Sequence, residues 1–77
     1  MVLTPGQCRA ARALLNMSQP QLAAAASVGL STVRDFERGA RNPITNNLAA
    51  IRNALESAGV KFVAEDNWRG VMQMDKR

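Results

Sequence analysis

The stretch 17–39 constrains the fold most, because it carries the signals for two short helices separated by a tight turn. Ser18 is a good N-cap, and Gln21 three residues later completes a Ser-x-x-Gln capping box. Met17 and Leu22 flank this cap at the positions of a hydrophobic staple. The run of alanines that follows is small and apolar, so the first helix of the pair is suited to close packing against another helix.

The second helix of the pair follows a break in the helical period, where Gly29 is expected to supply the backbone angles of the turn. It runs from about Leu30 to just before Gly39, a natural C′ residue. Val33 and Phe36 lie three apart and predict its inward side. Its polar side comprises Ser31, Arg34, Asp35 and Arg38. A short exposed helix with donors and acceptors of both signs is typical of one that reads base edges in a major groove.

Through these residues the sequence resembles the lambda-repressor/Cro-like helix-turn-helix family (XRE type), over roughly residues 7–58. Many members have glycine where this chain has Ser27, and a polar N-cap where it has Gly29. The resemblance implies a four-helix DNA-binding domain. The residues that carry it are Ser18-Gln19, Leu22-Ala23, Val28, Ser31-Thr32-Val33 and Phe36-Glu37-Arg38-Gly39.

In such a motif the second helix enters the major groove while the first lies across the DNA backbone. The predicted base-reading residues are Leu30, Ser31, Arg34 and Asp35. Arginine pairs with guanine, aspartate accepts from cytosine N4, and leucine suits a thymine methyl group. Two other interpretations of Asp35 stay open, namely that it orients Arg34 or that it repels wrong sites.

Phosphate contacts are expected around this helix. The amide of Gln19 and the start of the following helix at Asn46 both suit an anion. The resemblance also places backbone contacts in the loop after the motif. The predicted phosphate-binding residues are Gln19, Arg38, Arg41, Asn42 and Asn46.

The resemblance implies one structural ion pair. In the family an arginine of the first helix pairs with the glutamate near the end of the recognition helix, and the matching residues here are Arg12 and Glu37. This pair would hold the two helices together without reading bases. The alternative is that Arg12 is a solvated surface residue.

Composition narrows the function. The 77 residues form one small domain, and a net charge of +4 with eight Arg and two Lys favours a polyanionic partner. With Cys8 as the single cysteine and no histidine, we expect no metal site, no cofactor and no Cys/His catalytic pair, so an enzyme is the weakest hypothesis. No apolar run approaches a membrane span and no signal peptide is recognisable, so a cytoplasmic protein is expected. No ligand-binding domain is recognisable beside the motif, so no small-molecule ligand is expected.

Outside the motif, the sequence predicts two further helices. Thr4-Pro5-Gly6-Gln7 is a helix start, and the stripe Cys8, Ala11 and Leu15 faces the core. The other helix begins near Thr45 and ends at Gly59. Its apolar stripe is Leu48, Ile51, Leu55 and Ala58. The helix-turn-helix domain is therefore expected to span residues 1–59.

The last part of the chain, 60–77, is expected to form a β-hairpin. Residues 60–64 suit a strand, Glu65-Asp66-Asn67 is a turn signal, and a second strand is expected from Val71 to Met74 after Gly70. A fifth helix is the alternative, although β-branched residues disfavour it. A lone hairpin is marginal in water, so a homodimer joined here is expected, unless the tail folds back over the helices. The predicted dimer residues are Phe62, Val63, Trp68, Val71 and Met72.

The fold class expected is therefore mainly α, a four-helix lambda-repressor-like domain with a short C-terminal β-hairpin. The function expected is a sequence-specific regulator of transcription, a repressor or autoregulator, bound to double-stranded DNA as a dimer on an inverted repeat. The rival hypothesis is a protein-interaction module, antitoxin-like or anti-activator, that inhibits a protein partner. The arginines of the motif and its following loop argue against that rival.

Overall fold

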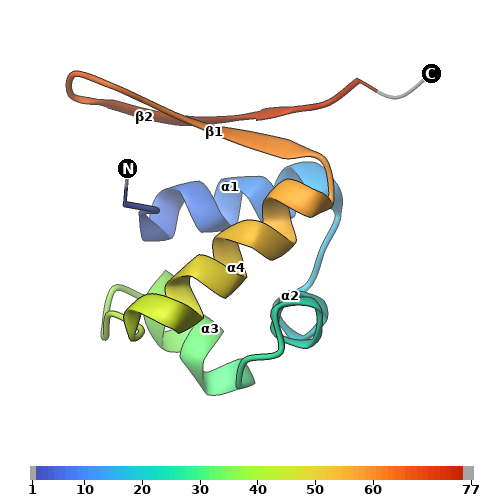
Figure 1. Ribbon diagram of the computed structural model, residues 1–77, viewed down its shortest axis with the longest axis vertical. Helices are drawn as coiled ribbons and strands as arrows, with labels where there is room; N and C mark the ends of the chain where they lie inside the picture. Colours follow the sequence, from blue (N-terminus) through green and yellow to red (C-terminus); the bar gives the residue numbers. More distant parts are fainter. Residues whose placement is uncertain (1, 76–77) are drawn as a thin grey trace.

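The computed structural model describes residues 2–75 and shows four helices followed by a two-stranded antiparallel hairpin (Figure 1). The predicted fold class is confirmed, and the hairpin replaces the alternative of a fifth helix. Helices α2 and α3 lie at one end of the molecule and the hairpin lies across the other end, above α1. The elements are α1 (Pro5–Leu15), α2 (Gln19–Ala26), α3 (Leu30–Glu37), α4 (Thr45–Ser57), β1 (Val60–Glu65) and β2 (Trp68–Gln73).

Both predicted capping boxes are present. The Thr4 hydroxyl accepts from the Gln7 backbone N–H at 3.1 Å, and the Gln7 side chain accepts from the Thr4 N–H at 3.0 Å. Ser18 and Gln21 repeat the arrangement at 3.1 and 2.8 Å. Each box satisfies two of the backbone donors that a helix start leaves free, so local sequence fixes where α1 and α2 begin.

The turn between α2 and α3 differs from the prediction. Ser27 adopts the left-handed conformation, with φ 56°, whereas Gly29 has φ −68° and serves as the N-cap of α3. The prediction that Gly29 supplies the unusual turn angles was wrong. The chain leaves α2 at its C-cap, where the Ser27 N–H donates to the carbonyl of Ala24 at 3.2 Å, so the left-handed residue comes two positions earlier.

The core joins all four helices and the start of the hairpin. Val33 and Phe36 are buried as predicted for the inward side of α3. Cys8 and Ala11 are buried on α1, while Leu15 is only partly buried. The full buried apolar set is Leu3, Cys8, Ala11, Leu22, Ala23, Ala26, Val33, Phe36, Ile51, Leu55, Val60 and Phe62.

The hairpin is longer than predicted. Its turn is complete within Asp66 and Asn67, so pairing resumes at Trp68 rather than at Val71. Asp66 takes the left-handed conformation that this tight connection needs, with φ 52°. Gly70, expected to precede the second strand, instead lies within it and pairs with Val63.

One buried side chain fastens the hairpin to the helices. The Gln7 amide nitrogen donates to the carbonyls of Val63 at 3.1 Å and Gly70 at 2.9 Å, one on each strand. Nearer the end of β2, the Gln73 amide donates to the Leu14 carbonyl at 2.9 Å. The hairpin therefore lies against α1 with a defined inner side and a defined outer side.

Candidate nucleic-acid interface

Helix α3 is held by one side and exposed on the other. Val33 and Phe36 are buried, so the helix cannot rotate without exposing them. Ser31 and Arg34 are exposed, and Asp35 is half-buried. Leu30, the fourth predicted base-reading residue, is partly buried and packs against the core, which leaves only part of its side chain for a base.

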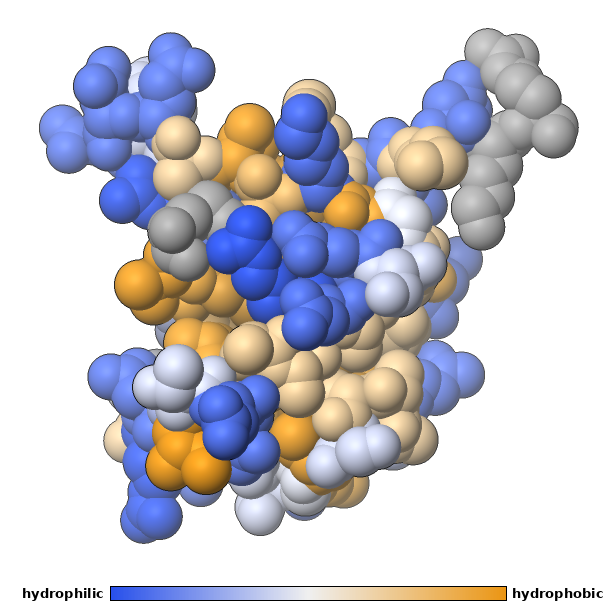
Figure 2. Space-filling view, in the orientation of Figure 1, coloured by the Kyte–Doolittle hydropathy of each residue, from blue (hydrophilic) through white to orange (hydrophobic). Residues whose placement is uncertain are grey.

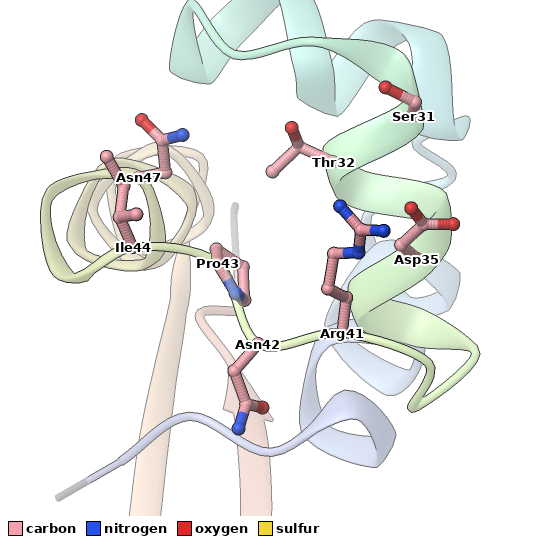
Figure 3. Close-up of a pocket in the computed structure, with 8 residues that line it drawn as sticks. All are labelled: Ser31, Thr32, Asp35, Arg41, Asn42, Pro43, Ile44 and Asn47. Carbon is pink, nitrogen blue, oxygen red and sulfur yellow. The ribbon is translucent and has the colours of Figure 1, made fainter.

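A polar groove runs beside α3, between that helix and the N-terminal end of α4 (Figure 3). The loop that follows α3 forms its floor, and Arg41 points from this loop towards Asp35. Thr32 and Asn47 point into the same space from the two helices. The groove is lined by Ser31, Thr32, Asp35, Arg41, Asn42, Pro43, Ile44 and Asn47.

Thr32 is a groove residue that the sequence interpretation missed. It was recognised as part of the motif, yet the bases were assigned to Leu30, Ser31, Arg34 and Asp35. The signal was present, because Thr32 and Asp35 are three apart and so share one side of a helix. Asn47 follows the predicted Asn46, and it is Asn47 that lines the groove.

Asp35 forms an ion pair with Arg38, with 2.6 Å between Oδ1 and a guanidinium nitrogen. Both residues belong to the polar side of α3 and both retain exposed side-chain surface. One interpretation left open was that Asp35 orients Arg34. In the structure Asp35 instead pairs with another arginine of the same helix side, Arg38. The second Asp35 oxygen is left to accept from an amino group such as cytosine N4.

The predicted phosphate-binding residues fall into two groups. Arg38, Arg41, Asn42 and Asn46 are exposed, and Arg41 and Asn42 line the groove. Gln19 is different, because its amide donates to Glu37 Oε1 at 3.0 Å. The structure thus uses the Gln19 side chain to join α2 to α3.

Glu37 is the centre of this junction and lies at the C-terminal end of α3. Its carboxylate accepts from Arg12 at 2.6 and 2.7 Å, so the two residues that the resemblance pairs are in bidentate contact. The Cys8 thiol also donates to this carboxylate, at 3.0 Å, and Arg9 donates to the Glu37 backbone carbonyl. The Glu37 side chain is only 3% exposed. The contacts from α1 and α2 provide it with hydrogen-bond donors and with the positive charge of Arg12, which compensate for its lost hydration.

The junction shifts three pKa values. Burial acts to raise the pKa of Glu37, but the hydrogen bonds from Arg12, Cys8 and Gln19 and the charge of Arg12 outweigh it and lower the pKa. The hydrogen bond to Glu37 raises the pKa of Arg12. Burial, and then the adjacent carboxylate, raise the pKa of the Cys8 thiol strongly, so the thiol stays protonated and acts as a donor.

Other kinds of site are not evident in the part of the chain that the structure describes. Within residues 2–75, no cluster of three or more potential metal ligands occurs. The helices of this range are too short or too polar to cross a membrane.

Comparison with known proteins agrees with the geometry. Residues 9–58, which cover most of α1 and all of α2, α3 and α4, match the model of the helix-turn-helix family. A comparison with curated proteins found no significant match. The matched segment contains every residue of the polar groove and the Glu37 junction from Arg9 onward.

Proposed function

Because the chain belongs to the helix-turn-helix family of XRE/Cro type, whose domains bind DNA, we propose that it is a sequence-specific regulator of transcription. It acts as a repressor or autoregulator, as a dimer on an inverted-repeat operator. The observation that carries the proposal is the polar side of α3, which presents Ser31, Arg34 and Asp35 beside an arginine-containing groove. Family members of this kind are typically not enzymes.

The proposed roles follow from chemistry and position. Arg34 donates to guanine O6 and N7, Asp35 accepts from cytosine N4, and Thr32 contacts a base or sugar at the groove. Arg41 and Asn42 hold phosphates of the adjacent backbone, together with Asn46 and Asn47 at the start of α4. Arg38 is kept close to α3 by Asp35 and contacts a phosphate on its exposed side.

The hairpin lies at the end of the molecule opposite α3 (Figure 1). A dimer joined through the hairpin can therefore bind one duplex only in certain relative orientations of the two copies. Both α3 helices of a dimer must face the same duplex. Pairing along the open edges of two hairpins meets this condition, since it extends the sheet in its own plane and keeps both sets of helices on one side. We assign the dimer contact to one such edge, with the same strand of each copy paired antiparallel.

A second candidate function, inhibition of a protein partner, remains in competition. Exposed apolar residues on the hairpin favour it, because Trp68 and Met72 are well exposed. The polar, basic surroundings of α3 favour DNA. Selection of binding sites from random DNA with the purified full chain separates the two, since only the DNA-binding function yields an enriched sequence.

Two arginine variants then test the assigned roles. Arg34→Ala is expected to weaken the selected site by about 1–3 kcal/mol and to relax preference at one position. Arg41→Ala is expected to weaken selected and random DNA alike and to reduce the dependence on salt concentration. Mobility shifts on both DNAs at several salt concentrations measure this difference. Equal binding of the parent protein to selected and random DNA would contradict the proposal.

A further inference from the structure

The hairpin has an outer side that no helix covers. Val60 and Phe62 of β1 are buried, so the alternation of a strand turns Lys61, Val63 and Glu65 to the other side. The register places one β2 residue directly opposite each of these three. The outer hairpin face therefore consists of Lys61, Val63, Glu65, Trp68, Gly70 and Met72.

On the outer hairpin face the charged residues lie on β1, at its two ends, and Met72 and Trp68 of β2 lie directly opposite Lys61 and Glu65. Trp68 is 78% exposed, Met72 51% and Val63 37%. In Figure 2, hydrophobic and hydrophilic residues are interspersed along the upper border, where the hairpin lies. Lys61 and Glu65 form no ion pair with another residue of the range 2–75. An exposed surface containing tryptophan and methionine is typical of an interface core.

We propose that this face binds the outer hairpin face of a second copy, with the strands of the two copies antiparallel. A twofold axis across the strands at the Val63–Gly70 pair brings Lys61 of each copy opposite Glu65 of the other. The same axis stacks Trp68 on Met72 of the other copy, a favourable sulfur–aromatic contact. At the centre, Gly70 adds no side chain, and the Val63 side chain lies over it, with Val63 Cγ2 3.3 Å from where a Cβ at Gly70 would lie. The face is self-complementary in charge.

This contact joins the copies at the ends remote from α3, because the hairpin and α3 lie at opposite ends of the molecule. The two α3 helices then point in opposite directions and cannot read one duplex. They hold two separate DNA segments, a consequence that rests on the proposed function. An edge-paired dimer on one operator leaves the outer hairpin face free, so the two contacts are compatible.

The size of the face sets the strength of the contact. Two six-residue strands give a face about 20 Å long and only two strands wide. Its area is therefore well short of the roughly 800 Å² per partner of a stable interface. The free protein therefore associates weakly. On two nearby DNA sites the high effective concentration makes the same contact sufficient.

Charge reversal tests the antiparallel arrangement. In sedimentation equilibrium of the full chain, Lys61→Glu alone and Glu65→Lys alone are each expected to weaken self-association about tenfold. An equimolar mixture of the two variants is expected to regain it, because opposite charges again meet at both ends. Asn53→Glu, at an exposed position of α4 outside both proposed contacts, is the control and leaves this association unchanged. Single variants that associate like the parent, or a mixture as weak as either variant, would overturn the inference.

A bridging assay tests the consequence for DNA. A biotinylated fragment carrying a selected site is expected to retain a second, fluorescent fragment when the parent protein is present. Each single charge variant is expected to lose this retention while still shifting one fragment. If no DNA is shifted but the charge pattern of association holds, the proposed function fails and the hairpin contact stands. If DNA is shifted but the charge pattern is absent, the hairpin contact fails alone.

Discussion

At the scale of single residues, Glu37 determines how α3 is held. A carboxylate that is almost fully buried is costly unless its partners compensate for lost hydration, and Arg12, Cys8 and Gln19 do so from two other helices. None of these contacts involves the residues assigned to DNA bases. The carboxylate is therefore a structural group whose ionisation is coupled to folding.

That coupling predicts a pH dependence. The pKa of Glu37 is lowered in the folded chain from its ordinary value of 4.5, so the unfolded state takes up a proton first as the solution is acidified. The stabilisation is fully present above about pH 4.5 and is lost as the pH falls through the lower, folded pKa.

Denaturant titrations of the parent and Glu37→Gln from pH 7 to pH 3 measure this effect. The difference in unfolding free energy between the two proteins is expected to be constant at higher pH and to shrink below about pH 4.5. A difference that stays unchanged down to pH 3 would mean that Glu37 has the same pKa in the folded and unfolded states.

A second prediction concerns Ser27, which holds a left-handed backbone conformation that costs an L-residue about 1–2 kcal/mol. Glycine adopts this conformation without the steric cost. Ser27→Gly is therefore expected to raise the free energy of unfolding by about 1 kcal/mol. The matched control is Ser57→Gly at the helical end of α4, where the same substitution is expected to lower stability. Thermal melts of both variants decide between a local backbone effect and a general effect of glycine.

At the scale of elements, the sequence predicted the helices well because their ends carry local signals. The capping boxes at Thr4 and Ser18 are encoded within four residues, and the apolar spacing in α3 specifies one inward side. The hairpin was harder, because strand pairing depends on where a turn closes. A turn of two residues rather than a longer loop moved the start of β2 from Val71 to Trp68.

The attachment of the hairpin also lies beyond local signals. Gln7 was predicted only as part of a capping box, yet its amide also donates to carbonyls of both strands, more than fifty positions away. A glutamine side chain has both an acceptor and donors, and here the acceptor caps α1 while the donors hold the hairpin. Only the folded chain shows this double use.

This double use predicts that Gln7→Ala loosens the hairpin. The substitution removes donors to two backbone carbonyls and is expected to lower stability by about 1–3 kcal/mol. Hydrogen exchange is expected to show a larger loss of protection in the hairpin than in α4. Gln73→Ala, which removes one exposed bond to α1, is the control with a smaller effect. Equal loss of protection throughout the chain would instead indicate a uniform reduction in global stability.

At the scale of the whole molecule, the candidate DNA site was predicted only in part. The polar side of α3 follows from helical spacing, so the sequence predicts that Ser31 and Asp35, which line the groove, share that side. The groove also needs the loop after α3 to bring Arg41 beside Asp35, and α4 to bring Asn47 opposite Thr32 (Figure 3). Such contacts between separate elements have no periodic signature. The packing of the hairpin on the helices has no periodic signature either. Phe62 was therefore assigned to a dimer interface, but it is buried in the core of its own chain.

The proposed operator-bound dimer makes a prediction at this scale. Half-sites whose centres lie about 10–10.5 base pairs apart place both α3 helices on one side of the duplex. Insertion of about 5 base pairs turns one half-site to the opposite side and is expected to abolish cooperative binding, whereas insertion of a full turn is expected to preserve part of it. Mobility shifts on this series of DNAs measure it. Indifference to the insertions would indicate that each chain binds alone.

The position of Glu37 has a consequence for how this protein can change. Its contacts fasten the C-terminal end of α3, and the buried Val33 and Phe36 fix the side of the helix that faces inward. The exposed residues Ser31 and Arg34 contribute little to folding, so mutations there carry a small penalty in stability. New operator preferences are therefore accessible by single substitutions in a chain that remains folded. A library randomised at these two positions is a practical starting point for redirecting the protein to chosen DNA sequences.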